Sequence, residues 1–195
     1  PPRIALGNPE MYYRTNTTNI MFFFTPTDNS GNITNCTLIL NGQPNETLTP
    51  IINGAEHNIT VSGLQDGTYN WTVNCTDTSG ESTQPTAYNL TVDRSKPSIV
   101  LYYPENGDTI SNDTVKFNFT VTDNLDLSLV CNLTIDGVVS TTNSNFDAGN
   151  NSVTNITENN LADGNHNWSI TCWDDAININ TSEMIIVNSI KKRNI

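Results

Sequence analysis

Residues 69–75 have the sequence YNWTVNC, in which apolar and polar side chains strictly alternate. Residues 166–172, HNWSITC, repeat this pattern with His in the first position. Such alternation is typical of an antiparallel strand with one face on a core and the other in solvent. We therefore expect Trp71, Val73 and Cys75 to point inward, and the Asn residues between them to point outward.

These two strands belong to an internal repeat that covers nearly the whole chain. Phe22 and Phe24 align with Phe117 and Phe119 at a shift of 95 residues. The later Trp71 aligns with Trp168 at a shift of 97. The two extra residues belong in a loop, where chains tolerate changes in length. The segment 93–97, DRSKP, suits a tight linker. We therefore predict two domains, residues 1–95 and 96–195.

Each repeat reads as short strands separated by turn signals such as Asn41-Gly42 and Asp136-Gly137. In the first repeat, strands are expected near residues 3–7, 20–26, 35–41, 47–52, 57–62, 68–76 and 86–92. No segment has a convincing helical period. About seven short strands in each repeat predict an all-β fold of two tandem immunoglobulin-like β-sandwich domains.

The four cysteines can pair in three ways. The repeat favours Cys36 with Cys75 and Cys131 with Cys172, because the other pairings would join separate domains. Each of these bonds closes a loop in the unfolded chain and should stabilise the folded domain by about 3–4 kcal/mol. Disulfides also indicate an oxidising compartment. A metal site is the alternative, but the close Cys pairs that zinc favours are absent from the sequence.

Glycosylation sequons, Asn-x-Ser/Thr, are more than twice as frequent as the Asn, Ser and Thr content predicts by chance. They begin at Asn16, Asn32, Asn35, Asn45, Asn58, Asn70, Asn74, Asn89, Asn112, Asn118, Asn132, Asn150, Asn155, Asn167 and Asn180. Those at Asn70, Asn74, Asn118 and Asn167 fall on the outward side of alternating strands, where a glycan has room. We expect many of these sites to carry N-linked glycans.

Charge and hydropathy exclude two classes of protein. The net charge of −12, with only eight Lys and Arg, leaves no basic stripe for a nucleic acid. No run approaches the roughly 20 apolar residues of a membrane span. The basic cluster Lys191-Lys192-Arg193 is expected to be a linker or tail, with a membrane or polyanion contact as the alternative. The chain opens at Pro1 without Met, and we expect it to be a mature or excised piece.

Catalytic signatures are weak, and we expect no enzyme. His57 and His166 occupy non-equivalent positions of the repeat, and no nucleophile, zinc-protease or phosphate-loop motif is present. We expect His57 to be solvated beside a turn. His166 stands where the first repeat has Tyr69, and is expected to be a strand-end residue.

One strand breaks the alternation in a way that predicts an interface. Residues 20–24, IMFFF, place Met21 and Phe23 outward, whereas the second repeat has polar residues there. Exposed Met and Phe together indicate a contact with another domain or subunit. The alternative is that a loop or the N-terminal segment of the same domain covers both.

Acidic residues should gather at one pole of each domain, Asp28 with Asp77 and Asp123 with Asp174. Because Ca²⁺ takes oxygen ligands, Asp123 and Asp174 are calcium candidates. Turn capping by these side chains is the favoured alternative, since no dense Asp/Asn loop pattern is present. We otherwise expect no cofactor.

Residues 93–101, DRSKPSIVL, followed by 104–107, PENG, look like the first strand of Ig-like repeats in prokaryotic surface proteins. Residues 64–77, LQDGTYNWTVNCTD, are similar to the closing strand of such repeats, especially in archaeal surface proteins. The resemblance covers both repeats. It implies tandem arrays on the cell exterior with adhesion, envelope or filament roles.

Two features depart from antibody-type domains. The first Cys precedes the third strand, so each disulfide is expected to join neighbouring strands of one sheet. Tyr69 resembles the tyrosine corner, and His166 puts that hydrogen bond in doubt in the second repeat.

We therefore expect an extracellular, cell-surface structural protein, a glycosylated repeat of a filament, sheath or surface layer. Its partners would be copies of itself or neighbouring repeats, and exchange of an edge strand is one route to assembly. The alternative is an adhesin or receptor-like module that binds glycans or proteins through its loops.

Overall fold

The computed structural model describes residues 1–29, 31–112 and 114–190, so the tail Lys191-Lys192-Arg193 lies outside the described residues. The chain divides into two compact units, Pro1–Arg94 and Ser95–Ile195. All regular elements of the described residues are β-strands. None of these residues forms a helix of the length and hydropathy that a membrane span requires.

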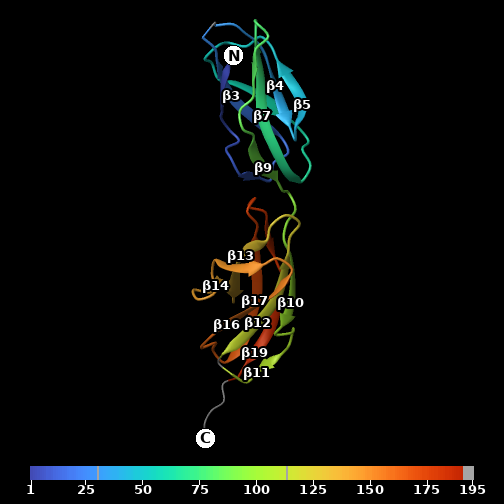
Figure 1. Ribbon diagram of the computed structural model, residues 1–195. Coiled ribbons are helices and arrows are strands. Elements are labelled where there is room, and N and C mark those ends of the chain that lie inside the picture. The colour runs from blue at the N-terminus through green and yellow to red at the C-terminus, as the bar shows by residue number, and fades with distance from the viewer. Residues whose placement is uncertain (30, 113, 191–195) are drawn as a thin grey trace. The chain divides into compact units, whose positions relative to one another are not determined.

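Unit 1 is a sandwich of two sheets (Figure 1). The smaller sheet has the order β1-β3-β6, built from β1 (Arg3–Leu6), β3 (Ile20–Thr27) and β6 (His57–Val61). The larger sheet has the order β2-β9-β7-β4-β5, with β8 (Ser82–Thr83) also paired to β7. Its strands are β2 (Tyr13–Thr15), β9 (Tyr88–Val92), β7 (Gly67–Asp77), β4 (Ile33–Leu40) and β5 (Gln43–Leu48).

Unit 2 repeats this arrangement. The smaller sheet has the order β10-β12-β16, from β10 (Ser98–Tyr103), β12 (Val115–Thr122) and β16 (Ser152–Glu158). The larger sheet has the order β11-β19-β17-β13-β14, with β15 paired to β13 and β18 to β17. Its strands are β11 (Thr109–Ile110), β19 (Ile185–Ser189), β17 (Gly164–Trp173), β13 (Ser128–Ile135), β14 (Val138–Val139), β15 (Phe146–Gly149) and β18 (Ile179–Thr181).

Each unit has its own core, made by the apolar side of the alternating strands. In unit 1 the ring of Phe22 on β3 meets Trp71 on β7 edge-to-face, with centroids 5.1 Å apart. The matched pair in unit 2, Phe117 and Trp168, has centroids 4.8 Å apart. Edge-to-face ring contacts of this kind stabilise a core by more than the burial of their apolar area alone would. The all-β, two-sandwich fold expected from the sequence is confirmed.

The structure also contains both expected disulfides. Cys36 on β4 stands directly opposite Cys75 on β7, and Cys131 on β13 stands opposite Cys172 on β17. Each bond therefore joins neighbouring strands of one sheet, as the position of the first Cys in each repeat predicts. Alternation points all four side chains into the cores, where they are fully buried.

One strand lies earlier than the sequence pattern predicts. The expected strand near 47–52 is β5, Gln43–Leu48. Asn41 and Gly42 have φ values of 50° and 74°, which is the backbone of a two-residue hairpin turn, so the next strand begins at once. The strands β2 and β8 were not predicted, because two or three residues are too few to display an alternation.

Candidate functional site

The sequons lie on the outside of both units. None of the fifteen Asn residues is buried, and all fifteen are among the described residues. Those that are well exposed are Asn16, Asn32, Asn45, Asn58, Asn70, Asn112 and Asn155. The other eight are partly exposed. On the strands, the alternation that builds the cores also presents acceptor side chains such as Asn58, Asn70 and Asn155 to solvent. The exposed Asn16, Asn32 and Asn112 lie outside the strands.

In two sequons of unit 2, the Asn Nδ2 atom itself donates to backbone carbonyl oxygens. The Asn150 Nδ2 atom donates to the carbonyl oxygens of Asp123, at 2.8 Å, and Asp126, while its Oδ1 accepts from the Asp123 N–H. The Asn180 Nδ2 atom donates to the Pro97 carbonyl oxygen at 2.8 Å. A glycan replaces one hydrogen on Nδ2, so both sites suit modification less than the exposed ones do. The sequon motif alone does not reveal this difference.

In unit 1, Asp28 and Asp77 share one pole, as the repeat predicts. Their Oδ2 atoms lie 4.0 and 3.9 Å from the Pro1 nitrogen. Asp77 Oδ1 accepts hydrogen bonds from the Ser79 hydroxyl at 2.6 Å and from the Ser79 and Glu81 N–H groups. The Ser79 hydroxyl is the main cause that lowers the pKa of Asp77. Asp77 therefore caps its turn.

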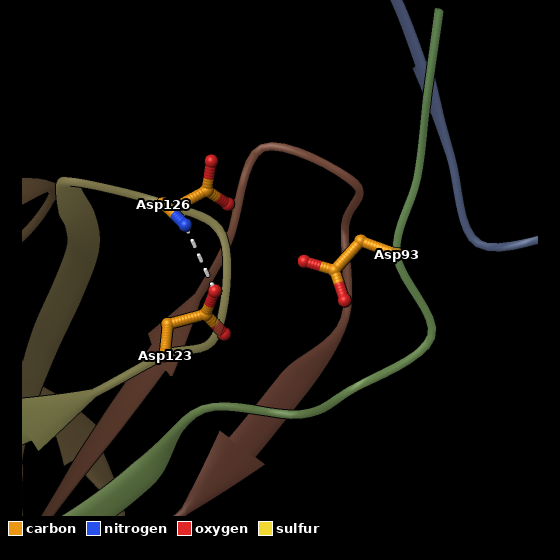
Figure 2. Close-up of side chains that lie close together, drawn as sticks. All are labelled: Asp93, Asp123 and Asp126. Atoms are coloured by element: carbon orange, nitrogen blue, oxygen red, sulfur yellow. Dashed lines mark hydrogen bonds between the residues drawn. The ribbon is translucent and has the colours of Figure 1, made fainter. Parts of the chain in front are cut away.

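The calcium candidates of unit 2 also accept hydrogen bonds from their own turns. Figure 2 shows Asp123 Oδ1 accepting the N–H of Asp126 at 3.1 Å, and it accepts that of Leu125 at 3.0 Å as well. Both oxygens of Asp174 accept from Asn178. Asp93, also drawn in Figure 2, belongs to unit 1, where its N–H donates to the Thr15 carbonyl.

The pKa of the Asp174 carboxyl group is raised above its ordinary value. Burial is the main cause, and the negative charge of Asp123 adds to it. Turn capping, which the sequence favoured over calcium binding, accounts for the hydrogen bonds that Asp77, Asp123 and Asp174 accept. Calcium binding by Asp123 and Asp174 stays a prediction.

The corner hydrogen bond is present in both units. The Tyr69 hydroxyl donates to the Gln65 carbonyl at 2.9 Å, and His166 Nε2 lies 2.9 Å from the Ala162 carbonyl. The doubt raised by the Tyr-to-His difference is therefore removed, because the imidazole reaches the carbonyl four residues back just as the phenol does.

His166 gains a second partner that Tyr69 does not have. Its Nδ1 lies 2.6 Å from Asp136 Oδ2, and Asp136 Oδ1 accepts the Asn167 N–H at 2.9 Å. Burial alone would lower the pKa of His166, but the bonds to Asp136 and Ala162 raise it above its ordinary value. In unit 1 the neutral Asn41 takes the place of Asp136 and accepts the Asn70 N–H at 2.9 Å. The contact could have been found from the sequence, because two positions differ together between the repeats. Asn41 and Tyr69 of the first repeat are replaced by Asp136 and His166 in the second.

His57 keeps part of its surface exposed beside the turn, and it also makes contacts that the sequence did not predict. Its ring stacks on Phe24 with centroids 5.9 Å apart. Its Nε2 lies 3.1 Å from both the nitrogen and the carbonyl oxygen of Ile52. These contacts tie the loop before β6 to the sandwich, which is a structural role.

A polar cluster in unit 2 was not predicted. The Glu158 carboxylate at the end of β16 accepts hydrogen bonds from Ser140 Oγ at 2.5 Å, Thr142 Oγ1 at 3.0 Å and Asn143 Nδ2 at 2.9 Å. These partners lie in the loop between β14 and β15, so the cluster links the two sheets of the sandwich. Unit 1 has Val61 at the position of Glu158, and the repeat therefore gave no signal for it.

The expected interface residues Met21 and Phe23 differ in exposure. Met21 is 54% exposed, whereas Phe23 is partly covered. The N-terminal segment runs beside Phe23, and a Cβ atom on Gly7 would lie 3.2 Å from the Phe23 Cβ. The N-terminal segment of the same unit therefore covers part of Phe23, as the alternative to a subunit interface predicts. A contact of Met21 and Phe23 with another subunit stays a prediction.

Comparisons with known proteins support the fold. No protein-family model and no curated protein matches the chain. Among solved structures, the fibronectin(III)-like modules of Clostridium thermocellum CbhA are similar, with 15% identity, a TM-score of 0.56, and coverage of 97% of this chain and 95% of that one. At this identity the likeness shows a shared fold of tandem Ig-like and fibronectin III-like sandwiches.

Two further structures match with lower scores. The D00-D0 domain of intimin has 9% identity and a TM-score of 0.43, with 95% of this chain and 99% of that chain covered. A chimeric titin Z1Z2-Z1Z2 tandem has 12% identity and a TM-score of 0.36, with 99% and 100% covered. Neither score is high enough to add to the argument.

Proposed function

We propose that this chain is a non-enzymatic structural module of the cell exterior, a glycosylated pair of Ig-like units that builds a filament, sheath or surface layer. The observation that carries the proposal is that two disulfide-closed sandwiches present fifteen sequons and bury none of them. Disulfides persist in oxidising compartments, and N-glycans need solvent-facing acceptors. The resemblance to repeats of prokaryotic, and most of all archaeal, surface proteins supports the same placement.

A non-enzymatic role is supported by what the polar side chains do. His166 and Asp136 hold a corner, His57 holds a loop, and Asp77 and Asp174 cap turns. A general acid or base must reach a substrate proton, and these groups are instead committed to the backbone of their own unit.

The partners we propose are further copies of the chain or neighbouring repeats. In the smaller sheet of unit 1, the outer strands β1 and β6 pair only with β3 among the described residues. In unit 2, β10 and β16 pair in the same way with β12. Such edges have backbone groups that accept a strand from a neighbour, which makes strand exchange a route to assembly.

Electron microscopy of natively purified protein tests this function. We expect periodic fibres or sheets, and dissociation of these should yield the glycosylated chain with both disulfides intact. Dispersed monomers that bind immobilised glycans or proteins would contradict the structural role and support the adhesin alternative.

A further inference from the structure

Phe23 on β3 and Asn58 on β6 stand directly opposite each other in the smaller sheet of unit 1. Their strand neighbours Phe22 and Ile59 are buried in the core. Because side chains alternate along a strand, Phe23 and Asn58 both project from the outward face of the sheet. Asn58 begins the sequon that ends at Thr60 and is well exposed.

The backbone hydrogen bonds place these two side chains at close range. The Phe23 N–H donates to the Asn8 carbonyl at 2.7 Å, and the Phe23 carbonyl accepts the Gly7 N–H at 2.8 Å. Both backbone groups of Phe23 therefore point away from β6. This makes Phe23 and Asn58 a non-hydrogen-bonded pair, the kind in which facing side chains approach most closely, with Cβ atoms about 4.5–5.5 Å apart.

A hollow adjoins Phe23 on this face. It has a volume of about 370 Å³, and the residues that line it include Pro9, Tyr13, Asn8, Asn19 and Met21. Apolar side chains thus lie beside amide groups. A pyranose ring has matching chemistry, since its C–H face is apolar and its hydroxyl edge forms hydrogen bonds.

We propose that the innermost sugar of an N-glycan on Asn58 stacks on the ring of Phe23 and that the glycan continues into this hollow. The chain's own sugar, rather than a second subunit, then covers the outward Phe. This inference rests on the glycosylation in the proposed function. A sugar attached one strand away is held at high effective concentration and loses little translational freedom when it packs, whereas a separate subunit would lose much more.

Unit 2 provides an internal control. Asn155 on β16 occupies the position of Asn58, and it stands opposite Asn118 on β12, at the position of Phe23. A sugar on Asn155 has no aromatic ring directly opposite it. Glycans on Asn58 and Asn155 should therefore differ in how strongly they stabilise their own units.

The experiment is a double-mutant cycle on the full chain, produced in a host that adds N-glycans. Thr60→Val removes the sequon but keeps Asn58, and Phe23→Gln removes the ring without creating a new sequon. We expect Thr60→Val to lower the unfolding midpoint of unit 1 by about 2–8 °C when Phe23 is present. In the Phe23→Gln background, we expect Thr60→Val to have no further effect. If Phe23→Gln does not fold, Phe23→Leu keeps the packing and removes only the ring.

Thr157→Val, which removes the Asn155 sequon, is the matched control and should act independently of Phe23. Equal shifts from Thr60→Val with and without Phe23 would overturn the proposal. So would oligomers that dissociate on the Phe23 substitution while the effect of the glycan is unchanged, because Phe23 would then be a subunit contact. Glycopeptide masses distinguish a failure of this inference from a failure of the proposed glycosylation. If Asn58 alone is unmodified, this inference fails, but if every sequon is unmodified, the proposed glycosylation fails with it.

Discussion

His166 and Asp136 do in unit 2 what Tyr69 and Asn41 do in unit 1, but with groups that titrate. The imidazole contacts both the Asp136 carboxylate and the Ala162 carbonyl, and it can donate to both at once when it is protonated. In unit 1 the corresponding groups are the Tyr69 hydroxyl and the amide of Asn41. The two units should therefore respond differently to pH.

We predict that the corner makes unit 2 more stable in mild acid than in mild base. Because the pKa of His166 is raised, its contribution is full below the ordinary value of 6.5 and is lost as the pH rises through the folded pKa. Because the pKa of Asp136 is lowered, its contribution is present above 3.8 and is lost as the pH falls through its folded pKa.

His166→Tyr, which copies unit 1, tests this by calorimetry at a series of pH values. The variant should lose less stability than the wild type between about pH 5 and pH 8. Tyr69→Phe, which changes the corner of unit 1, should not alter this slope. An identical slope in the wild type and His166→Tyr would show that the corner does not titrate.

Asn150 is predicted to be a structural residue in spite of its sequon. Its amide satisfies the carbonyls of Asp123 and Asp126 and the N–H of Asp123. Asn150→Ala, made in a host that adds no glycans, should cost about 1–3 kcal/mol because these groups lose their partner. Denaturant unfolding measures this cost. Asn70→Ala at an exposed sequon should change stability by less than about 0.5 kcal/mol, and equal costs would contradict the assignment.

At the scale of the elements, the disulfides and the Glu158 cluster connect strands and loops within each unit. Each disulfide joins two adjacent interior strands of a larger sheet, β4 with β7 or β13 with β17. The Glu158 carboxylate links the end of one sheet to a loop of the other.

Removing a disulfide should cost about 3–4 kcal/mol, because each closes a loop of 39 or 41 residues in the unfolded chain. We predict this loss for Cys36→Ala with Cys75→Ala, and the same for the pair in unit 2. Urea unfolding of each double variant measures it. A loss well under 1 kcal/mol would mean that the bond adds little to the sandwich.

Glu158→Ala should destabilise unit 2 by about 1–3 kcal/mol, since three polar partners lose their acceptor. Thermal unfolding with Glu46→Ala as the control separates this from a general effect of removing charge, because Glu46 is exposed. If the two substitutions change the unfolding midpoint of their own units by equal amounts relative to the wild type, the cluster does not hold the sheets together.

At the scale of the whole chain, the repeat explains how much could be predicted from sequence. Features present in both copies, such as Trp71 with Trp168 or the four cysteines, were predicted from their alternation and their shift. Features that differ between copies were missed or doubted, as with Glu158 and His166. The position of β5 was missed because the strand was placed from its apolar residues, whereas the Asn41-Gly42 turn, with positive φ at both residues, lets the strand begin at once.

The central claim is that both units are closed by their own disulfide and carry glycans on their outward faces. Non-reducing peptide mapping of natively purified protein by mass spectrometry tests it most directly. We predict Cys36–Cys75 and Cys131–Cys172 peptides, with sugar mass on exposed sequons such as Asn70 and on Asn167 in unit 2. Free thiols, a disulfide between the two units, or unmodified Asn at every sequon would contradict the account.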